Sequence, residues 1–171
     1  MPTARNDLGV STMLRAEAVG VPGKRRFRLV VEAERGSAEV WIEKEQLSAL
    51  ALSLKQAIDE MGDRRPSEEA APPSASAREP RFDFKASSLG LSYDEAAGRF
   101  GIQAATPEDA EAKTATLVFW VTRDQAERMA DEALEVVAAG RPFCPLCHGP
   151  MDPDGHLCPM SNGHGPIDEH L

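Results

Sequence analysis

The sequence predicts an α+β protein made of a duplicated β-β-β-α unit, with antiparallel strands and two helices, followed by a C-terminal zinc-ribbon-like knuckle. Two observations lead to this class. Trp41 and Trp120, the only tryptophans, occupy matching places in two similar segments. All three cysteines and all four histidines lie within residues 144–170, and thiols and imidazoles at such spacing are typical of a zinc site.

The two tryptophan segments share an order of residue types. Residues 40–47 and 119–126 each read apolar residue, tryptophan, aliphatic residue and one variable residue, then basic, acidic, glutamine and apolar residues. Such a run is typical of a strand that leads directly into a helix. The match favours a duplicated unit over two unrelated strand–helix junctions.

Three strands are expected before the first helix. Residues 13–19 and 26–33 flank a turn at 21–23, and a third strand covers 38–42. Apolar residues alternate from Phe27 to Ala33, which suits a half-buried antiparallel strand.

The second half repeats this order. Strands are expected over 82–93 and 100–105, on either side of a turn at 94–98. A polar loop at 106–113 leads to a third strand at 115–121.

Each half ends in a one-sided helix. After Glu43 and again after Thr122, apolar residues recur at spacings of three and four. Thr122 and Gln125 have the form of a capping box. Gly62 and Gly140 follow the last turns, as glycines often do at helix C-termini.

The expected layout therefore has four parts: the first half at 1–62, a linker at 63–80, the second half at 81–140 and a zinc-binding tail at 141–171. The linker is rich in Pro, Ala, Ser and Glu and has no aliphatic residue larger than alanine. It buries too little apolar surface to offset its ordering entropy, so we expect it to be flexible.

Composition narrows the classes of function. The net charge is −9, and nucleic acids and anionic membranes attract proteins with a basic field. The start of the chain lacks the apolar core of a signal peptide, and no apolar run approaches membrane-spanning length. We expect a cytoplasmic protein with reduced thiols, because an odd number of cysteines suits disulfides poorly.

The tail is the clearest chemical signal. Cys144 and Cys147 form a Cys-x-x-Cys knuckle, and a turn at 152–155 brings the chain back towards it. Cys158 is the third expected ligand of a structural Zn²⁺. His156 and His164 are alternative fourth ligands, since both lie close to Cys158 in the sequence.

Other chemistries of the tail are less favoured. A redox Cys-x-x-Cys pair normally opens a helix after a strand, and Pro145 and Gly149-Pro150 argue against that context. A catalytic zinc would need an open coordination position and a nearby base. The available carboxylates suit turns and surfaces instead: Asp152, Asp154, Asp168 and Glu169.

The sequence also resembles a family of small, mostly actinobacterial proteins classed as a domain of unknown function, with a C-terminal zinc-ribbon-like tail. The matching features are residues 21–23, 41–47 and 90–94, with the tail at 140–147, 152–159 and 162–163. The family tail carries Gly-His-x-Cys-Pro, so the resemblance favours His156 as fourth ligand. His148 and Met160 stand where the family usually has glycine and arginine.

The sequence is compatible with two functions of different classes. The first is a zinc-stabilised binding or regulatory module for a protein or small-molecule partner, because the body contains no histidine and no Gly-rich phosphate loop. The second is an enzyme acting on a small phosphorylated or nucleotide-like metabolite. Candidate groups for it are the anion-binding Lys24, Arg25, Arg26 and Arg28, and the carboxylates Asp83, Asp94 and Glu95.

The first of these is favoured, so we expect no catalytic residues. The basic residues at 24–28 also suit a solvated strand edge, where they discourage unwanted pairing. Nucleic-acid binding through the zinc ribbon is a weaker alternative, because residues 143–171 contain no Lys or Arg.

Overall fold

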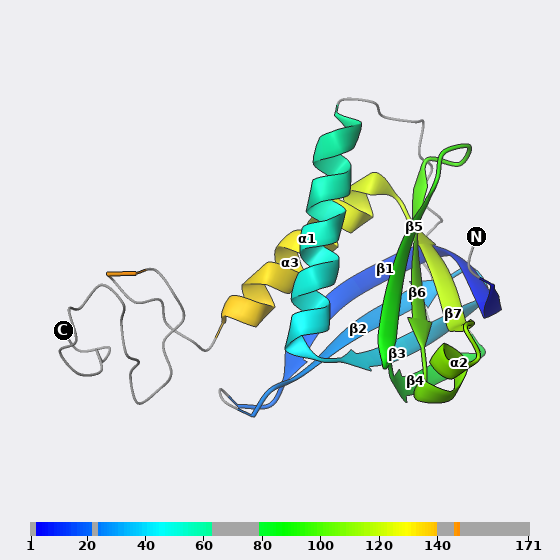
Figure 1. The fold of residues 1–171 in the computed structure, drawn as a ribbon, viewed down its shortest axis with the longest axis horizontal. Coiled ribbons are helices and arrows are strands. Elements are labelled where there is room, and N and C mark those ends of the chain that lie inside the picture. The colour runs from blue at the N-terminus through cyan, green and yellow to red at the C-terminus, as the bar shows by residue number, and fades with distance from the viewer. Residues whose placement is uncertain (1–2, 22–23, 63–78, 140–145, 148–171) are drawn as a thin grey trace.

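A computed structural model describes residues 3–21, 24–62, 79–139 and 146–147. Seven strands form one mixed sheet in the order β4-β3-β2-β1-β7-β6-β5 (Figure 1). The strands are β1 (Ala4–Val19), β2 (Arg26–Ala33), β3 (Gly36–Ile42), β4 (Arg81–Lys85), β5 (Ser88–Asp94), β6 (Arg99–Ala105) and β7 (Ala115–Val121). The helices are α1 (Lys44–Met61), α2 (Pro107–Glu111) and α3 (Arg123–Ala138). The predicted α+β class is confirmed.

The two predicted helices are present where the apolar periodicity placed them. α1 buries Leu47, Leu50, Leu54 and Ile58 along one face. α3 begins with the predicted capping box, in which Gln125 N donates to Thr122 Oγ1 at 3.2 Å and Thr122 N donates to Gln125 Oε1 at 3.0 Å. The two helices pack against each other and are joined by an ion pair between Lys55 and Asp131.

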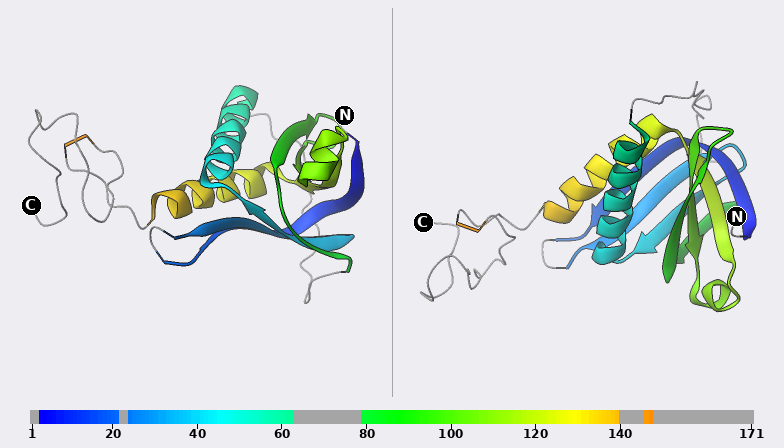
Figure 2. Two further views of the ribbon diagram at one scale, coloured as in Figure 1. Left: turned by 60° about the horizontal axis from the view of Figure 1, so that its bottom comes forward. Right: turned by 45° about the horizontal axis from the view of Figure 1, so that its top comes forward.

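The sheet bends strongly, so that β5, β6 and β7 cross over β1, β2 and β3 (Figure 2). The buried apolar side chains lie between these two parts and under the helices. The largest of them are Phe100, Phe119, Leu8, Leu29, Leu47, Leu54, Ile102, Leu117 and Met129. Together they form one continuous hydrophobic core, which explains why neither half stands as a separate layer.

Both halves use the same pattern of strand pairing. The first part of β1 runs parallel to β7, and its later part runs antiparallel to β2. Likewise β4 runs parallel to β3, while β5 runs antiparallel to β6. Each half therefore contributes its leading segment to the third strand of the other half. The repeated pairing agrees with an internal duplication, which itself stays a prediction.

The prediction of a single strand at 82–93 is wrong. It is two strands, β4 and β5, which lie at opposite ends of the sheet order. The chain changes neighbour at Ala86 and Ser87, where Ala86 N donates to Trp41 O and Ser87 N donates to Ala105 O. The alternation changes phase here, from Phe82, Phe84 and Ala86 to Leu89, Leu91 and Tyr93, which is the sequence signal for the break. Alternation reports the buried face and not the pairing partner, so it does not predict that the two strands lie at opposite ends of the sheet.

Three further expectations need correction. The sheet includes two parallel pairs, so its strands are not all antiparallel. The polar loop expected at 106–113 contains α2, which begins with Thr106 as N-cap: Asp109 N donates to Thr106 Oγ1 at 3.2 Å. β1 also begins well before residue 13, because its first residues pair with β7.

The last two residues of the expected linker, Glu79 and Pro80, belong to the described part of the chain. Pro80 O accepts a hydrogen bond from Ser37 N at 3.0 Å, just before β4 begins. The remainder of the linker, at 63–78, and nearly all of the tail lie outside the described residues. In the described part of the chain, no helix combines the length and apolar character needed to cross a membrane.

Candidate functional site

Trp41 lies at the centre of a charged cluster on the sheet face opposite the core. The Arg26 guanidinium carbon lies 4.3 Å from the Trp41 ring centroid, and that of Arg28 lies 5.2 Å from it. On the other side, Trp41 Nε1 donates to Asp83 Oδ1 at 2.9 Å. A half-buried indole is therefore held in one orientation by two cations and one carboxylate.

The strand register builds this cluster. Glu17 pairs with Arg28, Arg28 with Trp41, and Trp41 with Lys85, so one residue from each of four strands lies in a row on the same face. Alternate residues of β2 point to the core, beginning with Phe27 and Leu29. Arg26 and Arg28 therefore project together from the opposite face.

Arg28 is engaged by acidic neighbours. Its guanidinium forms ion pairs with Glu17 at 2.8 Å and with Glu39 at 3.0 Å. The hydrogen bond with Glu17 and the negative charges of Glu17, Glu39 and Asp83 raise the pKa of Arg28, against the opposing effect of burial. Arg28 thus serves to hold three strands and Trp41 in place.

Arg26 differs from its neighbour. It is exposed, and no carboxylate of the described residues lies within ion-pair distance of it. Its contact is with the Trp41 ring, and the residue is exposed to solvent. A guanidinium next to an indole is a common pairing at binding surfaces.

The four predicted anion-binding residues do not all meet. The structure brings Arg26 and Arg28 together at Trp41, whereas Arg25 turns away and donates from Nη1 to Ala139 O at the end of α3, at 2.9 Å. Lys24 lies in the hairpin turn, where its backbone nitrogen donates to Val21 O.

The carboxylates considered for proton transfer are also separated. Asp83 accepts from Trp41, and Asp94 accepts from the backbone nitrogens of Ala96 and Ala97 in the turn before β6. Glu95 lies exposed in the same turn. These contacts give Asp83 and Asp94 structural roles.

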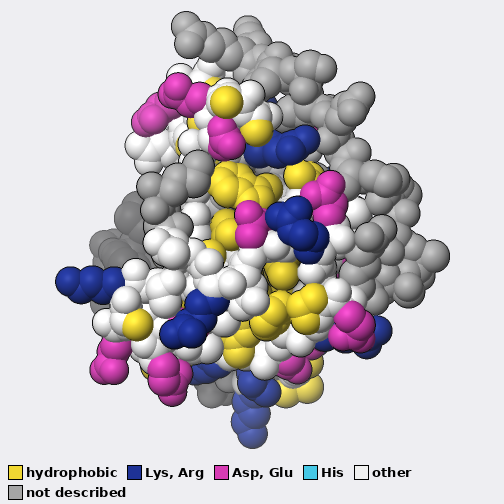
Figure 3. Space-filling model, turned by 90° about the vertical axis from the view of Figure 1, so that its right-hand side faces the viewer, with side chains coloured by type: hydrophobic (Ala, Val, Ile, Leu, Met, Phe, Trp, Pro, Cys, Tyr) yellow, Lys and Arg dark blue, Asp and Glu magenta, His cyan; other side chains and the backbone are white. Residues whose placement is uncertain are grey.

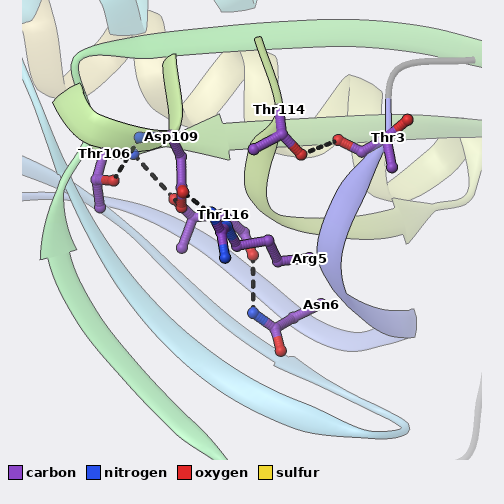
Figure 4. Close-up of polar contacts among 7 residues, drawn as sticks. All are labelled: Thr3, Arg5, Asn6, Thr106, Asp109, Thr114 and Thr116. Carbon is purple, nitrogen blue, oxygen red and sulfur yellow. Dashed lines mark hydrogen bonds and ion pairs between the residues drawn. The ribbon is translucent and has the colours of Figure 1, made fainter. Parts of the chain in front are cut away.

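A second polar cluster surrounds Asp109 at the start of β1 (Figure 4). Thr116 Oγ1 donates to Asp109 Oδ2 at 2.6 Å, and Arg5 Nε lies 2.7 Å from Asp109 Oδ1. The hydrogen bond from Thr116 and then the charge of Arg5 lower the pKa of Asp109. Asn6 Nδ2 also donates to Thr116 O at 2.9 Å. Since its members bind one another, the cluster fastens α2 and β7 to β1.

The surface offers no large field of one sign on the side drawn in Figure 3. There Lys and Arg side chains lie next to Asp and Glu side chains around small apolar groups. A shallow depression of about 230 Å³ lies beside Trp41, between β2, β3 and β4, and carries both Arg81 and the acidic Glu39 and Asp83. Charges of both signs therefore meet in this depression.

The predicted zinc ligands fall almost entirely outside the described residues. Cys147 is the exception and lies half-exposed in a short turn after Leu146. In the part of the chain that the structure describes, no group of three His, Cys, Asp or Glu side chains is placed to hold a metal ion. The zinc assignment therefore rests on the sequence.

Sequence reasoning missed the pairing of Arg26 with Trp41. The alternation of Arg26 and Arg28 on one face of a strand was a signal, but it acquires meaning only when the register with β3 is known. It also missed Asp109, because nothing in the sequence relates it to Arg5.

The fold and the Trp41 cluster define an α+β protein with a bent mixed sheet, helices on one side and a charged, tryptophan-centred outer face. Neither the curated proteins nor the solved structures include a match to this chain. The chain belongs to the family described as "Protein of unknown function (DUF3090)", whose model matches residues 7–158.

Proposed function

We propose that this protein is a zinc-stabilised binding module that recognises an anionic group of its partner at the Trp41 cluster. The body provides a rigid surface, and the tail holds a structural Zn²⁺ through Cys144, Cys147, Cys158 and His156. The partner is a protein segment or a small molecule with a carboxylate or phosphate.

One observation carries this proposal: the exposed Arg26 guanidinium lies 4.3 Å from the Trp41 ring centroid, without a carboxylate partner among the described residues. Arg28 and Asp83 fix the indole from either side, so the surface is preorganised before a ligand arrives. Arginine next to tryptophan is typical of residues that dominate binding energy at interfaces. The guanidinium geometry matches carboxylate and phosphate.

The donor set of the tail supports the zinc part of the proposal. Three thiolates and one imidazole complete a closed tetrahedral site, which stabilises local structure and leaves no position for a substrate. Zinc is thus assigned a structural role, next to a body that carries the binding surface.

Indole fluorescence tests the binding surface directly. In a Trp120→Phe background, Trp41 is the sole tryptophan, and its emission reports on ligands that reach Arg26. Titration with inorganic phosphate and, separately, with a glutamate-rich peptide distinguishes a small anion from an acidic protein segment. We expect a saturable change with one of the two probes.

Arg26→Ala should weaken the response about tenfold or more, which corresponds to the loss of one charge-assisted contact. Arg128→Ala is the control, because Arg128 is an exposed arginine of α3 and lies outside the Trp41 cluster. Equal responses of the two variants, or no saturable change with either probe, would contradict the proposal.

A further inference from the structure

The two ends of the sheet are protected very differently. At one end, β4 is short, follows Pro80 and alternates Arg81, Asp83 and Lys85 on its exposed side. Proline and charged residues are the usual means by which edge strands avoid pairing with another chain. At the other end, residues 88–93 of β5 contain no charge and no proline. In the described part of the chain, β5 pairs only with β6.

An uncharged groove lies along this open edge. It measures about 260 Å³ and separates β5 from α1. Its lining is Gln46, Ala49, Leu50, Ser53, Leu89, Gly90 and Leu91. No charged residue occurs in α1 between Glu45 and Lys55, whereas the exposed side of α3 carries Asp124, Glu127, Asp131, Glu132 and Glu135.

The corresponding edge in the other half is closed. There α3 packs closely on β1, and Gln125 bonds both the hydroxyl and the carbonyl of Ser11. On the β5 side, α1 contacts the strand less extensively than α3 contacts β1. Gln46 Nε2 donates to Ser87 O, just before β5 begins, at 3.1 Å. The groove lies beyond Ser87, between α1 and residues 89–91 of β5.

We propose that a second copy of this chain occupies the edge, with β5 of one protomer pairing antiparallel to β5 of its partner about a two-fold axis at Leu91. A two-fold contact places the same surface on both sides, so the strand must be complementary to itself. Pairing about Leu91 sets Leu89 against Tyr93, Gly90 against Ser92, and Ser88 against Asp94.

This register is self-complementary in both polarity and charge. Leu89, Leu91 and Tyr93 already pack partly against the core, so the joined strands extend one apolar strip across the axis. The single acidic residue of the strand, Asp94, faces a serine and not another carboxylate. Each chain carries a net charge of −9, so two copies repel each other unless they meet through an uncharged surface of this kind.

Light scattering coupled to size-exclusion chromatography of the full chain, over a dilution series, tests the proposal. We expect a mass twice the 18.5 kDa of one chain. Leu91→Lys places two lysines opposite each other at the axis and should raise the dissociation constant by more than about a hundredfold. Ala49→Arg fills the groove from an exposed helix position and should raise it by about tenfold or more.

Phe84→Lys is the matched control, since Phe84 is a half-buried residue on the protected edge, and it should leave the dimer intact. Circular dichroism establishes whether each variant is folded. If Leu91→Lys does not fold, the dissociation constant of Ala49→Arg alone tests whether β5 forms the dimer contact. A monomer throughout the wild-type series overturns the proposal. So does a dimer that both edge variants leave unchanged, or one that Phe84→Lys weakens equally.

Discussion

Gln125 and Ser11 exchange two hydrogen bonds in the interior, although 114 residues separate them in the chain. Gln125 Nε2 donates to Ser11 O at 2.9 Å, and Ser11 Oγ donates to Gln125 Oε1 at 3.0 Å. The same oxygen accepts from Thr122 N at 3.0 Å. One amide group thereby closes the capping box of α3 and joins that helix to β1.

Gln125→Met should destabilise the protein by about 3 kcal/mol, because it leaves buried groups of Ser11 and Thr122 without partners. Urea unfolding at neutral pH measures the difference. Gln46→Met is the matched control: Gln46 occupies the same place in α1, but its contacts with Glu43 N and Ser87 O are exposed to water. Gln46→Met should lower the free energy of unfolding by less than about 1 kcal/mol. An equal loss of stability in the two variants would refute the argument from burial.

Gly101 should not tolerate alanine. A Cβ at this position would lie 2.6 Å from Ser92 Oγ and 2.8 Å from the Trp120 ring, whose side chain is partly buried. We expect Gly101→Ala to cost about 1–3 kcal/mol through overpacking, measured by thermal unfolding. Gly90→Ala brings one atom too close, Gln103 Oε1 at 2.7 Å, and the other Gln103 atoms near it lie at 3.5 Å or more, so it should cost less.

Acid should weaken the attachment of β1 through Asp109. Its pKa is lowered in the folded state, first by the hydrogen bond from Thr116 and then by the charge of Arg5. The folded protein therefore binds fewer protons here than the unfolded chain, and the resulting stability is present above the unfolded value. It is lost as the pH falls below about 4 through the folded pKa.

Asp109→Asn should remove this contribution. The difference in urea midpoint between wild type and variant should be largest at neutral pH and should shrink as the pH falls below the ordinary aspartate value of about 4. Thr116→Val removes the hydrogen bond that lowers the pKa of Asp109 most. In this variant the loss of stability on acidification should therefore begin at higher pH than in the wild type. A difference between wild type and Asp109→Asn that stays constant with pH would show that the charge is not responsible.

The tail should bind about one Zn²⁺ per chain, as a closed four-ligand site requires. Cys158→Ser should abolish binding, as measured by metal analysis of the purified protein. We expect chelation to increase proteolysis of the tail, because structural zinc sites are coupled to local folding. The body should keep its unfolding transition, since the core formed by the described residues is made of residues 8–133.

Histidine variants identify the fourth ligand. His156→Ala should lower zinc affinity, whereas His148→Ala and His164→Ala should leave it near the wild-type value. Loss of zinc in His164→Ala alone would assign the fourth position to that residue. If the purified wild-type protein contains no metal and its tail is as resistant to proteolysis without chelation as with it, the zinc proposal is wrong.

The sequence by itself determined the local structure of the body. The spacing of apolar residues located α1 and α3, and the Thr122–Gln125 pattern located the start of α3, because helices depend on neighbours three and four residues apart. The strands at 26–33 and 115–121 match β2 and β7 for a similar reason, since alternation marks which face is buried.

The tertiary structure alone decided the pairing. It split the expected strand at 82–93 between two ends of the sheet, paired β1 with β7, and brought Arg5 to Asp109. It also placed Arg26 over Trp41 and left β5 as an uncharged edge beside α1. These relationships join residues that are distant in the chain, and their energy comes from packing and register that exist only once the sheet has formed.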